Sequence, residues 1–302
     1  MLCTERCALA WPAARAAFVV FAWMATSTLC AAEFPQQTQS SAASVRGSAY
    51  RPQLPDSDVS DHPLTPVIDY AHREQKFLRQ NVRDFTCRLV KRERIGHFLQ
   101  DVHFIDMQVR EGVYQNNQVV QPLSIYLHFL APRDVVDRRV IYIEGQNDGK
   151  MLVRNGGRHF EYVVATIDPN GENARQETLV PVTEIGFNRL LDKMIAVLER
   201  HRQADPTGEN TRAQRITGAK INDRSCTVIR ITHPRRMDQL EFHLANVFVD
   251  DALHVPVRVD YSDWPRREGD KPGLIAEYTY TQLQLNVDLP ENTFDRSRLR
   301  SR

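Results

Sequence analysis

The sequence predicts a mainly β fold with a few helices (α+β), in which about ten antiparallel strands form a sheet and two helices pack on one face. Two observations carry this prediction. From residue 85 onward most of the chain consists of short apolar runs separated by turn residues, without helices between them, which is typical of an antiparallel meander and argues against a parallel βαβ sheet. Two longer segments instead repeat apolar residues at the spacing of an amphipathic helix.

The N-terminal segment has the parts of a secretory signal peptide. Arg6 and Arg15 supply positive charge, residues 16–32 form an uncharged apolar stretch, and Cys30 and Ala32 match a small-x-small cleavage site. We therefore expect a protein exported to the periplasm or cell envelope, with a signal peptide over 1–32 that is cleaved near Ala32. The alternative is an uncleaved anchor, because the apolar stretch only just reaches the length that spans a bilayer. A lipid-modified Cys30 is disfavoured, since the residue before it is large.

Composition defines the remaining domain boundaries. Residues 33–62 are rich in Gln, Ser, Ala and Pro, and we expect a disordered linker there, because such a segment cannot bury enough surface to offset its conformational entropy. A single β-rich domain is expected over 63–295 and a polar tail over 296–302. Without Arg6, Arg15 and Glu5, the 39 basic and 38 acidic side chains fall to 37 of each. This neutral balance, without a basic cluster, predicts no nucleic-acid partner.

The folded part is predicted to begin with a helix near Pro66. Apolar residues recur near the helical period at Val67, Ile68, Tyr70, Ala71, Phe77 and Leu78, and the other face holds Arg73, Glu74 and Lys76. Beyond Arg83 the pattern changes to β-type runs at 85–90, 102–109, 123–129, 139–144, 151–153 and 160–164. Turn residues between these runs include Gly96, Pro132 and the segments 116–117, 147–149 and 155–157.

A second helix is predicted over 183–201, lying across the sheet. Thr183, after Pro181, suits the N-cap. The apolar stripe of this helix consists of Phe187, Leu190, Leu191, Met194, Val197 and Leu198. Strands then return at 213–221, 226–232, 239–249, 255–261 and 274–285.

Two cysteines, Cys87 and Cys226, remain after removal of the signal peptide. In an oxidising compartment they are able to pair, and a bridge closing so long a loop would stabilise the fold by about 4–5 kcal/mol on the chain-entropy model. The alternative is that both are small buried side chains on separate strands, which requires no bond. Neither cysteine is tied to a histidine motif, so a catalytic thiol is disfavoured.

Several short motifs together resemble a bacterial family of exported proteins known as domain of unknown function 1571. They are 84–94 (DFTCRLVKRER), 122–130 (PLSIYLHFL), 142–150 (YIEGQNDGK), 181–186, 249–250, 256–258, 263–265 and 277–280. The resemblance covers about residues 63–295. That family is in turn distantly similar to the periplasmic lipoprotein-carrier proteins, which implies an open, strongly curved half-barrel sheet with helices on its concave face. The resemblance also implies that a lipid or acyl chain binds between sheet and helices, although function belongs to a site and not to a fold.

A half-barrel covered by the helix at 183–201 would enclose a cavity. The side chains placed to line it are Ile125, Leu127, Phe129, Phe187, Leu191 and Met194. For each single residue ordinary core packing is the simpler interpretation, because alternating apolar residues on strands and a stripe on a helix are what any core contains. The hypothesis therefore concerns the cavity as a whole.

Motifs of catalysis are missing from the sequence. It contains no G-x-S-x-G elbow, no H-E-x-x-H helix, no phosphate-binding glycine loop and no C-x-x-C pair. We therefore expect neither an enzyme nor a cofactor. The run Lys91–Arg94 is interpreted as the solvated end of a strand, with contact to a lipid head group or partner as the alternative.

Metal binding has three candidates in the sequence, and each has a simpler explanation. His159 with Glu161, or His233 with His243 and His254, would need to converge on an ion, whereas isolated histidines are the commoner case. Residues 168–172 hint at a calcium loop, but an EF-hand would need Gly at position 173, where this chain has Asn. An ordinary turn and no metal are expected.

Two functional hypotheses follow. In the first, the protein is a monomeric binding module of the cell envelope that holds a lipid, acyl chain or lipoprotein between sheet and helix. In the second, it is a structural or protein-interaction domain of the envelope whose sheet is filled by its own side chains. A continuous apolar cavity on the order of several hundred Å³ beneath 183–201 would favour the first, and a filled core would favour the second.

Overall fold

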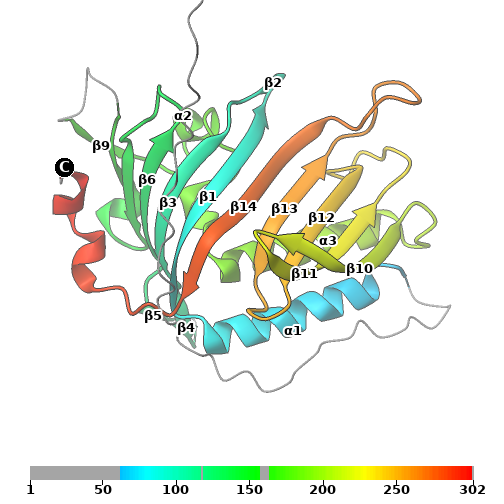
Figure 1. The fold of residues 1–302 in the computed structure, drawn as a ribbon, viewed down its shortest axis with the longest axis horizontal. Coiled ribbons are helices and arrows are strands. Elements are labelled where there is room, and N and C mark those ends of the chain that lie inside the picture. Colours follow the sequence, from blue (N-terminus) through cyan, green and yellow to red (C-terminus); the bar gives the residue numbers. More distant parts are fainter. Residues whose placement is uncertain (1–61, 117, 157–162, 301–302) are drawn as a thin grey trace, which may run out of the picture. The chain divides into compact units, whose positions relative to one another are not determined.

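The computed structural model describes residues 62–116, 118–156 and 163–300. The predicted signal peptide (1–32), nearly all of the predicted linker (33–62), and His159 with Glu161 lie outside the described residues. Within the described ranges the main element is an open sheet of 12 antiparallel strands, in the order β10-β11-β12-β13-β14-β1-β3-β6-β7-β8-β9, with β2 paired to β1 (Figure 1). The predicted antiparallel α+β fold is confirmed, with two strands more than the ten expected.

The elements have the following bounds. The sheet consists of β1 (Asp84–Ile95), β2 (Phe98–Leu99), β3 (His103–Arg110), β6 (Ser124–Ala131), β7 (Arg139–Ile143), β8 (Met151–Arg154), β9 (Val164–Ile167), β10 (Arg212–Ile221), β11 (Arg224–Thr232), β12 (Leu244–Asp250), β13 (Pro256–Ser262) and β14 (Leu274–Leu285). A separate hairpin consists of β4 (Val113–Gln115) and β5 (Gln118–Gln121). The helices are α1 (Thr65–Asn81), α2 (Glu172–Arg175), α3 (Phe187–Ala204) and the short 3-10 turns η1 (Asn147–Gly149), η2 (Val182–Glu184), η3 (Glu291–Phe294) and η4 (Arg296–Leu299).

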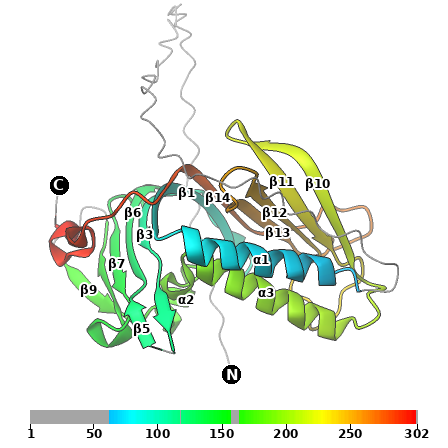
Figure 2. The same cartoon turned by 90° about the horizontal axis from the view of Figure 1, so that it is seen from below.

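Helices α1 and α3 run side by side across one face of the curved sheet (Figure 2). Val67 of α1 and Leu198 of α3 belong to one buried cluster with Ile229 of β11 and Val247 of β12. At the middle of the sheet, β1 pairs with β14, which joins the first strand of the domain to the last. The amphipathic patterns of the two helices are therefore satisfied by the same face of the sheet.

The start of α3 differs from the prediction. Thr183 lies inside η2, and the N-cap position belongs to Gly186, whose φ of 114° is a conformation that favours glycine. Glu111, far away in the sequence, accepts a hydrogen bond from the Phe187 backbone N–H at 2.6 Å. A Cβ at position 186 would lie 2.9 Å from Glu111 Oε2. The helix is thus capped by a tertiary contact in place of the local Thr183 side chain.

The C-terminal segment packs on the opposite face of the sheet. Because side chains alternate along a strand, Ile125 and Leu127 face the helices, whereas Tyr126 faces away from them. Phe294 and Leu299 form a buried cluster with Tyr126 on that outer face. The predicted polar tail over 296–302 is therefore corrected, since the packed part of the chain continues at least to Leu299.

The two cysteines are free and buried, Cys87 on β1 and Cys226 on β11. Three strands lie between them in the sheet, which separates their backbones far beyond the ~7 Å that a disulfide spans. The bridge considered above is therefore wrong, and the alternative of two small core side chains on separate strands is confirmed.

A protein lacking residues 1–32 is expected to show no reaction of Cys87 or Cys226 with a thiol reagent while it is folded. Burial raises the pKa of both thiols and so removes the reactive thiolate. In denaturant both cysteines should react fully without prior reduction. The variants Cys87→Ala and Cys226→Ala show which cysteine accounts for each reacted thiol. A requirement for reductant would contradict the structure.

Candidate ligand-binding cavity

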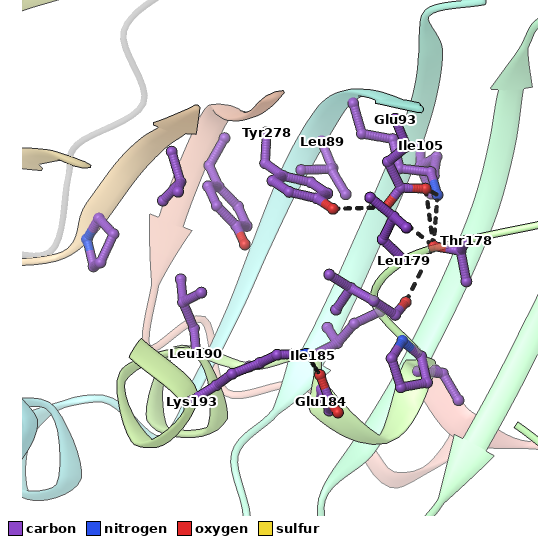
Figure 3. A pocket seen from close by; sticks show the side chains of 18 of the residues that line it. Leu89, Glu93, Ile105, Thr178, Leu179, Glu184, Ile185, Leu190, Lys193 and Tyr278 are labelled. Atoms are coloured by element: carbon purple, nitrogen blue, oxygen red, sulfur yellow. Dashed lines mark hydrogen bonds and ion pairs between the residues drawn. The ribbon is translucent and has the colours of Figure 1, made fainter. Parts of the chain in front are cut away.

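A cavity of about 550 Å³ lies between the sheet and the two helices. Strands β1, β3 and β6 form one wall, α1 and α3 form another, and the segment from Asn173 to Gly186 closes a third side (Figure 3). Most of the wall is apolar, and Val67, Leu89, Ile105, Met107, Leu190 and Val247 contribute to it. The space is thus a preformed apolar site with a few polar side chains, which is the usual character of a small-molecule pocket.

Four of the six side chains predicted to line a cavity do so: Leu127, Phe129, Leu191 and Met194. The structure places Ile125 and Phe187 elsewhere, fully buried in the core. The ring of Phe187 packs against Phe85 and Tyr280, at centroid distances of 4.5 Å and 5.4 Å. Phe187 is the first residue of α3 and belongs to the packing that anchors the helix.

The segment 172–186 was not predicted as part of the site. It contributes Thr178, Leu179 and Ile185 to the third side of the cavity, where Thr178 lies beside Glu93 of β1 (Figure 3). The Thr178 hydroxyl lies 3.0 Å from Glu93 Oε2 and accepts a hydrogen bond from Lys91 Nζ at 3.0 Å. The segment is therefore tied to β1 at the edge of the cavity.

Lys91 and Glu93 correct the interpretation of Lys91–Arg94 as a solvated strand end. Alternation along β1 places these two side chains on the inner face, with Leu89, and they are only 8% and 0% exposed. The Glu93 carboxylate accepts hydrogen bonds from Lys91 Nζ at 2.8 Å and from the Tyr278 hydroxyl at 2.7 Å. Burial, together with Tyr261 and Glu93, raises the pKa of Tyr278, so that this hydroxyl stays a donor. The result is a buried and satisfied polar cluster at one part of the cavity wall.

Glu74 was predicted on the solvent side of the first helix, but it lines the cavity and is only 3% exposed. It occupies the buried stripe of α1, four residues before Leu78 and three after Ala71. Among the described residues, neither carboxylate oxygen has a hydrogen-bond partner. His254 Nδ1 lies 3.7 Å from Oε2, outside hydrogen-bond distance. Burial raises the pKa of Glu74 to about 7, and Arg73 offsets only part of this effect.

The sequence does contain a signal for Glu74. A glutamate at a position that the helical period assigns to the buried face is exceptional, because charged side chains are almost never fully buried unless they are paired. Lys91 and Glu93 carry the same kind of signal on β1, where they alternate with Arg92 and Arg94. The 3.6-residue period of α1 and the two-residue alternation of β1, applied strictly, would have placed Glu74, Lys91 and Glu93 on the buried faces.

Histidines do not form a metal centre in the described part of the chain, where no group of three or more His, Cys, Asp or Glu side chains is arranged to hold an ion. His233 Nε2 lies 3.0 Å from His201 Nδ1, and His243 Nδ1 lies 3.0 Å from the backbone oxygen of His233. His254 lies beside Glu74 instead, so the three histidines considered above do not converge. At residues 168–172, the Asn170 backbone N–H donates to Asp168 Oδ1 at 2.9 Å, as in an ordinary turn.

Within the described residues (62–116, 118–156 and 163–300), every helix is too short or too polar to cross a bilayer.

A family model described as a protein of unknown function (DUF1571) matches residues 82–299. A search of curated proteins finds no significant match. Among solved structures, a DUF1329 family protein from Desulfovibrio piger is similar at 12% identity, covering 79% of this chain and 100% of that chain, with a TM-score of 0.37. A putative outer membrane lipoprotein-sorting protein domain from Vibrio parahaemolyticus has 12% identity, coverage of 78% and 98%, and a TM-score of 0.38. The lipoprotein LppX from Mycobacterium tuberculosis has 13% identity, coverage of 75% and 100%, and a TM-score of 0.37.

Proposed function

Because this chain belongs to the DUF1571 family, whose description states no activity, we propose a function from its cavity: a non-catalytic module that binds a lipid or acyl chain between sheet and helices. We further propose that this module acts as a monomer in the periplasm or cell envelope, the location that the predicted signal peptide indicates. Its ligand there would be a free lipid or the acyl part of a lipoprotein.

The apolar cavity of about 550 Å³ is the observation that carries this proposal. Its volume falls in the range of about 300–1,000 Å³ that is usual for small-molecule sites. An acyl chain entering it would remove apolar surface of both ligand and protein from water, at about 0.8 kcal/mol for each CH₂ group buried. A purely structural domain, the alternative above, would be expected to fill this space with its own side chains.

Leu127→Trp is expected to weaken binding of a fluorescent fatty acid by roughly tenfold or more, which corresponds to about 1.4 kcal/mol. The larger ring would occupy the cavity that Leu127 lines. Tyr126→Trp is the matched control, because Tyr126 is the neighbouring residue on β6 and lies in the cluster on the outer face. This control should bind the probe as the unmodified protein does.

Native mass spectrometry of the protein purified from its own envelope complements that titration. We expect a bound lipid in the unmodified protein and a smaller bound fraction in Leu127→Trp. The absence of a co-purifying lipid, together with no binding of the fluorescent fatty acid, would overturn the proposed function.

A further inference from the structure

Glu74 places a carboxyl group on the cavity wall, where His254 also lines the cavity and has its Nδ1 3.7 Å from Glu74 Oε2. The residues around it in the α1 stripe, Tyr70, Ala71 and Leu78, pack as core. Both oxygens of Glu74 lack a hydrogen-bond partner among the described residues. Burial of an unpaired carboxyl is unfavourable, and native proteins satisfy nearly all buried polar groups. An orphaned acceptor that lines a cavity therefore points to a partner that enters the cavity.

The charged and titratable side chains around Glu74 leave it unsatisfied. Tyr70 and Arg73 of α1 interact with it electrostatically, and Arg215 and Asp251 act on Tyr70 in turn. His254 packs its ring on Phe77 at 5.1 Å and lies 3.7 Å from Glu74 Oε2. None of these groups donates a hydrogen bond to the carboxyl. The missing donor must come from outside this set.

Glu74 differs from the other unpaired polar groups on the cavity wall. Gln100 Oε1 and His103 Nδ1 also lack partners, but both residues are only half-buried. The Lys91–Glu93–Tyr278 cluster is buried and already satisfied. Glu74 alone in this set combines near-complete burial with two free acceptor oxygens.

We propose that Glu74 accepts a hydrogen bond from an O–H or N–H group of the bound ligand, so that the cavity selects amphiphiles with a hydroxyl or amino group. This inference rests on the proposed function, because it requires a ligand in the cavity. A donor would satisfy the buried carboxylate through a charge-assisted bond, which is about twice as strong as a neutral one. A ligand without a donor, such as an ester, would leave the ionised carboxylate desolvated and unpaired. The comparison is therefore made at about pH 8, where Glu74, whose pKa is about 7, is ionised.

The test compares single-chain probes of equal chain length that differ only in the terminal group: a primary alcohol, an amine and a methyl ester. Each competes with the fluorescent fatty acid for delipidated protein. The unmodified protein should bind the alcohol and the amine roughly tenfold or more tightly than the ester, since sites built for a hydrogen bond reject analogues that lack it. In Glu74→Leu this preference should disappear while the ester binds at least as well.

Two further variants separate position from charge. Glu74→Gln keeps an acceptor oxygen for the alcohol but adds an N–H donor that an ester carbonyl accepts. It should therefore narrow the preference for the alcohol over the ester and lose part of the preference for the amine. Asp69→Leu removes an exposed carboxyl from the same helix and should leave both preferences unchanged. If every probe binds and Glu74→Leu ranks them as the unmodified protein does, the inference is overturned and the proposed function stands. If no probe binds the unmodified protein, the proposed function itself fails.

Discussion

Replacing Glu74 with leucine is expected to raise the free energy of unfolding by about 3 kcal/mol above pH 7. Burial raises the pKa of this carboxyl from 4.5 to about 7, and each pKa unit corresponds to about 1.4 kcal/mol. Leucine replaces a buried carboxyl that accepts no hydrogen bond from the described residues with an apolar side chain of similar size in the apolar stripe of α1. A substitution that abolishes ligand selectivity would therefore stabilise the fold, as is common for residues kept for function.

The gain depends on pH in a defined direction. A carboxyl whose pKa is raised in the folded state contributes its full stability below the unfolded value of 4.5, and this contribution is lost as the pH rises through about 7. Glu111 contributes in the same direction, because burial raises its pKa to about 7 despite its hydrogen bond from the Phe187 N–H. Buried His201 acts in the opposite direction, since burial lowers its pKa to about 4. Glu111 and His201 are present in both proteins, so the difference in stability between the unmodified protein and Glu74→Leu reports Glu74 together with its neighbour His254.

Urea denaturation at several pH values between about 5 and 8 measures this difference. The two proteins should have nearly equal stability at the acid end, and Glu74→Leu should become progressively more stable toward the alkaline end. Asp69→Leu, which changes an exposed carboxyl on the same helix, controls for the loss of one negative charge. A constant difference in stability across the whole pH range would contradict the burial of Glu74 without a hydrogen-bond donor.

Replacing Glu93 with alanine is expected to lower the free energy of unfolding by about 3–5 kcal/mol. Glu93 is completely buried, and its loss would leave the Lys91 ammonium, itself only 8% exposed, without a counter-ion. The Tyr278 hydroxyl would lose its acceptor as well. Removing one partner of a buried ion pair is costly mainly because the other charge remains in a medium of low dielectric constant.

Two variants test this explanation. The double substitution Lys91→Met with Glu93→Leu should recover most of the free energy of unfolding lost in Glu93→Ala, because no uncompensated charge remains. If the double variant is as unstable as Glu93→Ala, the loss of stability comes from lost packing and not from the uncompensated Lys91 charge.

Thr178→Val should lower the free energy of unfolding by only about 1 kcal/mol. It should also increase amide hydrogen exchange in residues 172–186, which Thr178 ties to β1.

Patterns that are local in sequence predicted most of the architecture. The alternation of strands with turn residues, and the apolar stripes of α1 and α3, depend on neighbours only a few residues apart. The interior was predicted less well. Leu127, Phe129, Leu191 and Met194 reach the cavity whereas Ile125 and Phe187 do not, because position along a curved sheet is not encoded in the apolar period.

The sequence by itself determined the antiparallel α+β fold, most of its strands and the presence of two covering helices, because hydrophobic periodicity and turn chemistry act over short distances. Contacts between residues that are distant in the chain were decided by the tertiary structure alone. Glu111 caps α3 from another part of the fold, Thr178 reaches Glu93, and Leu299 packs on the outer face of the sheet. Glu74 belongs to this second class: its position in α1 is local, but the cavity that leaves its carboxyl unpaired exists only once sheet and helices have packed together.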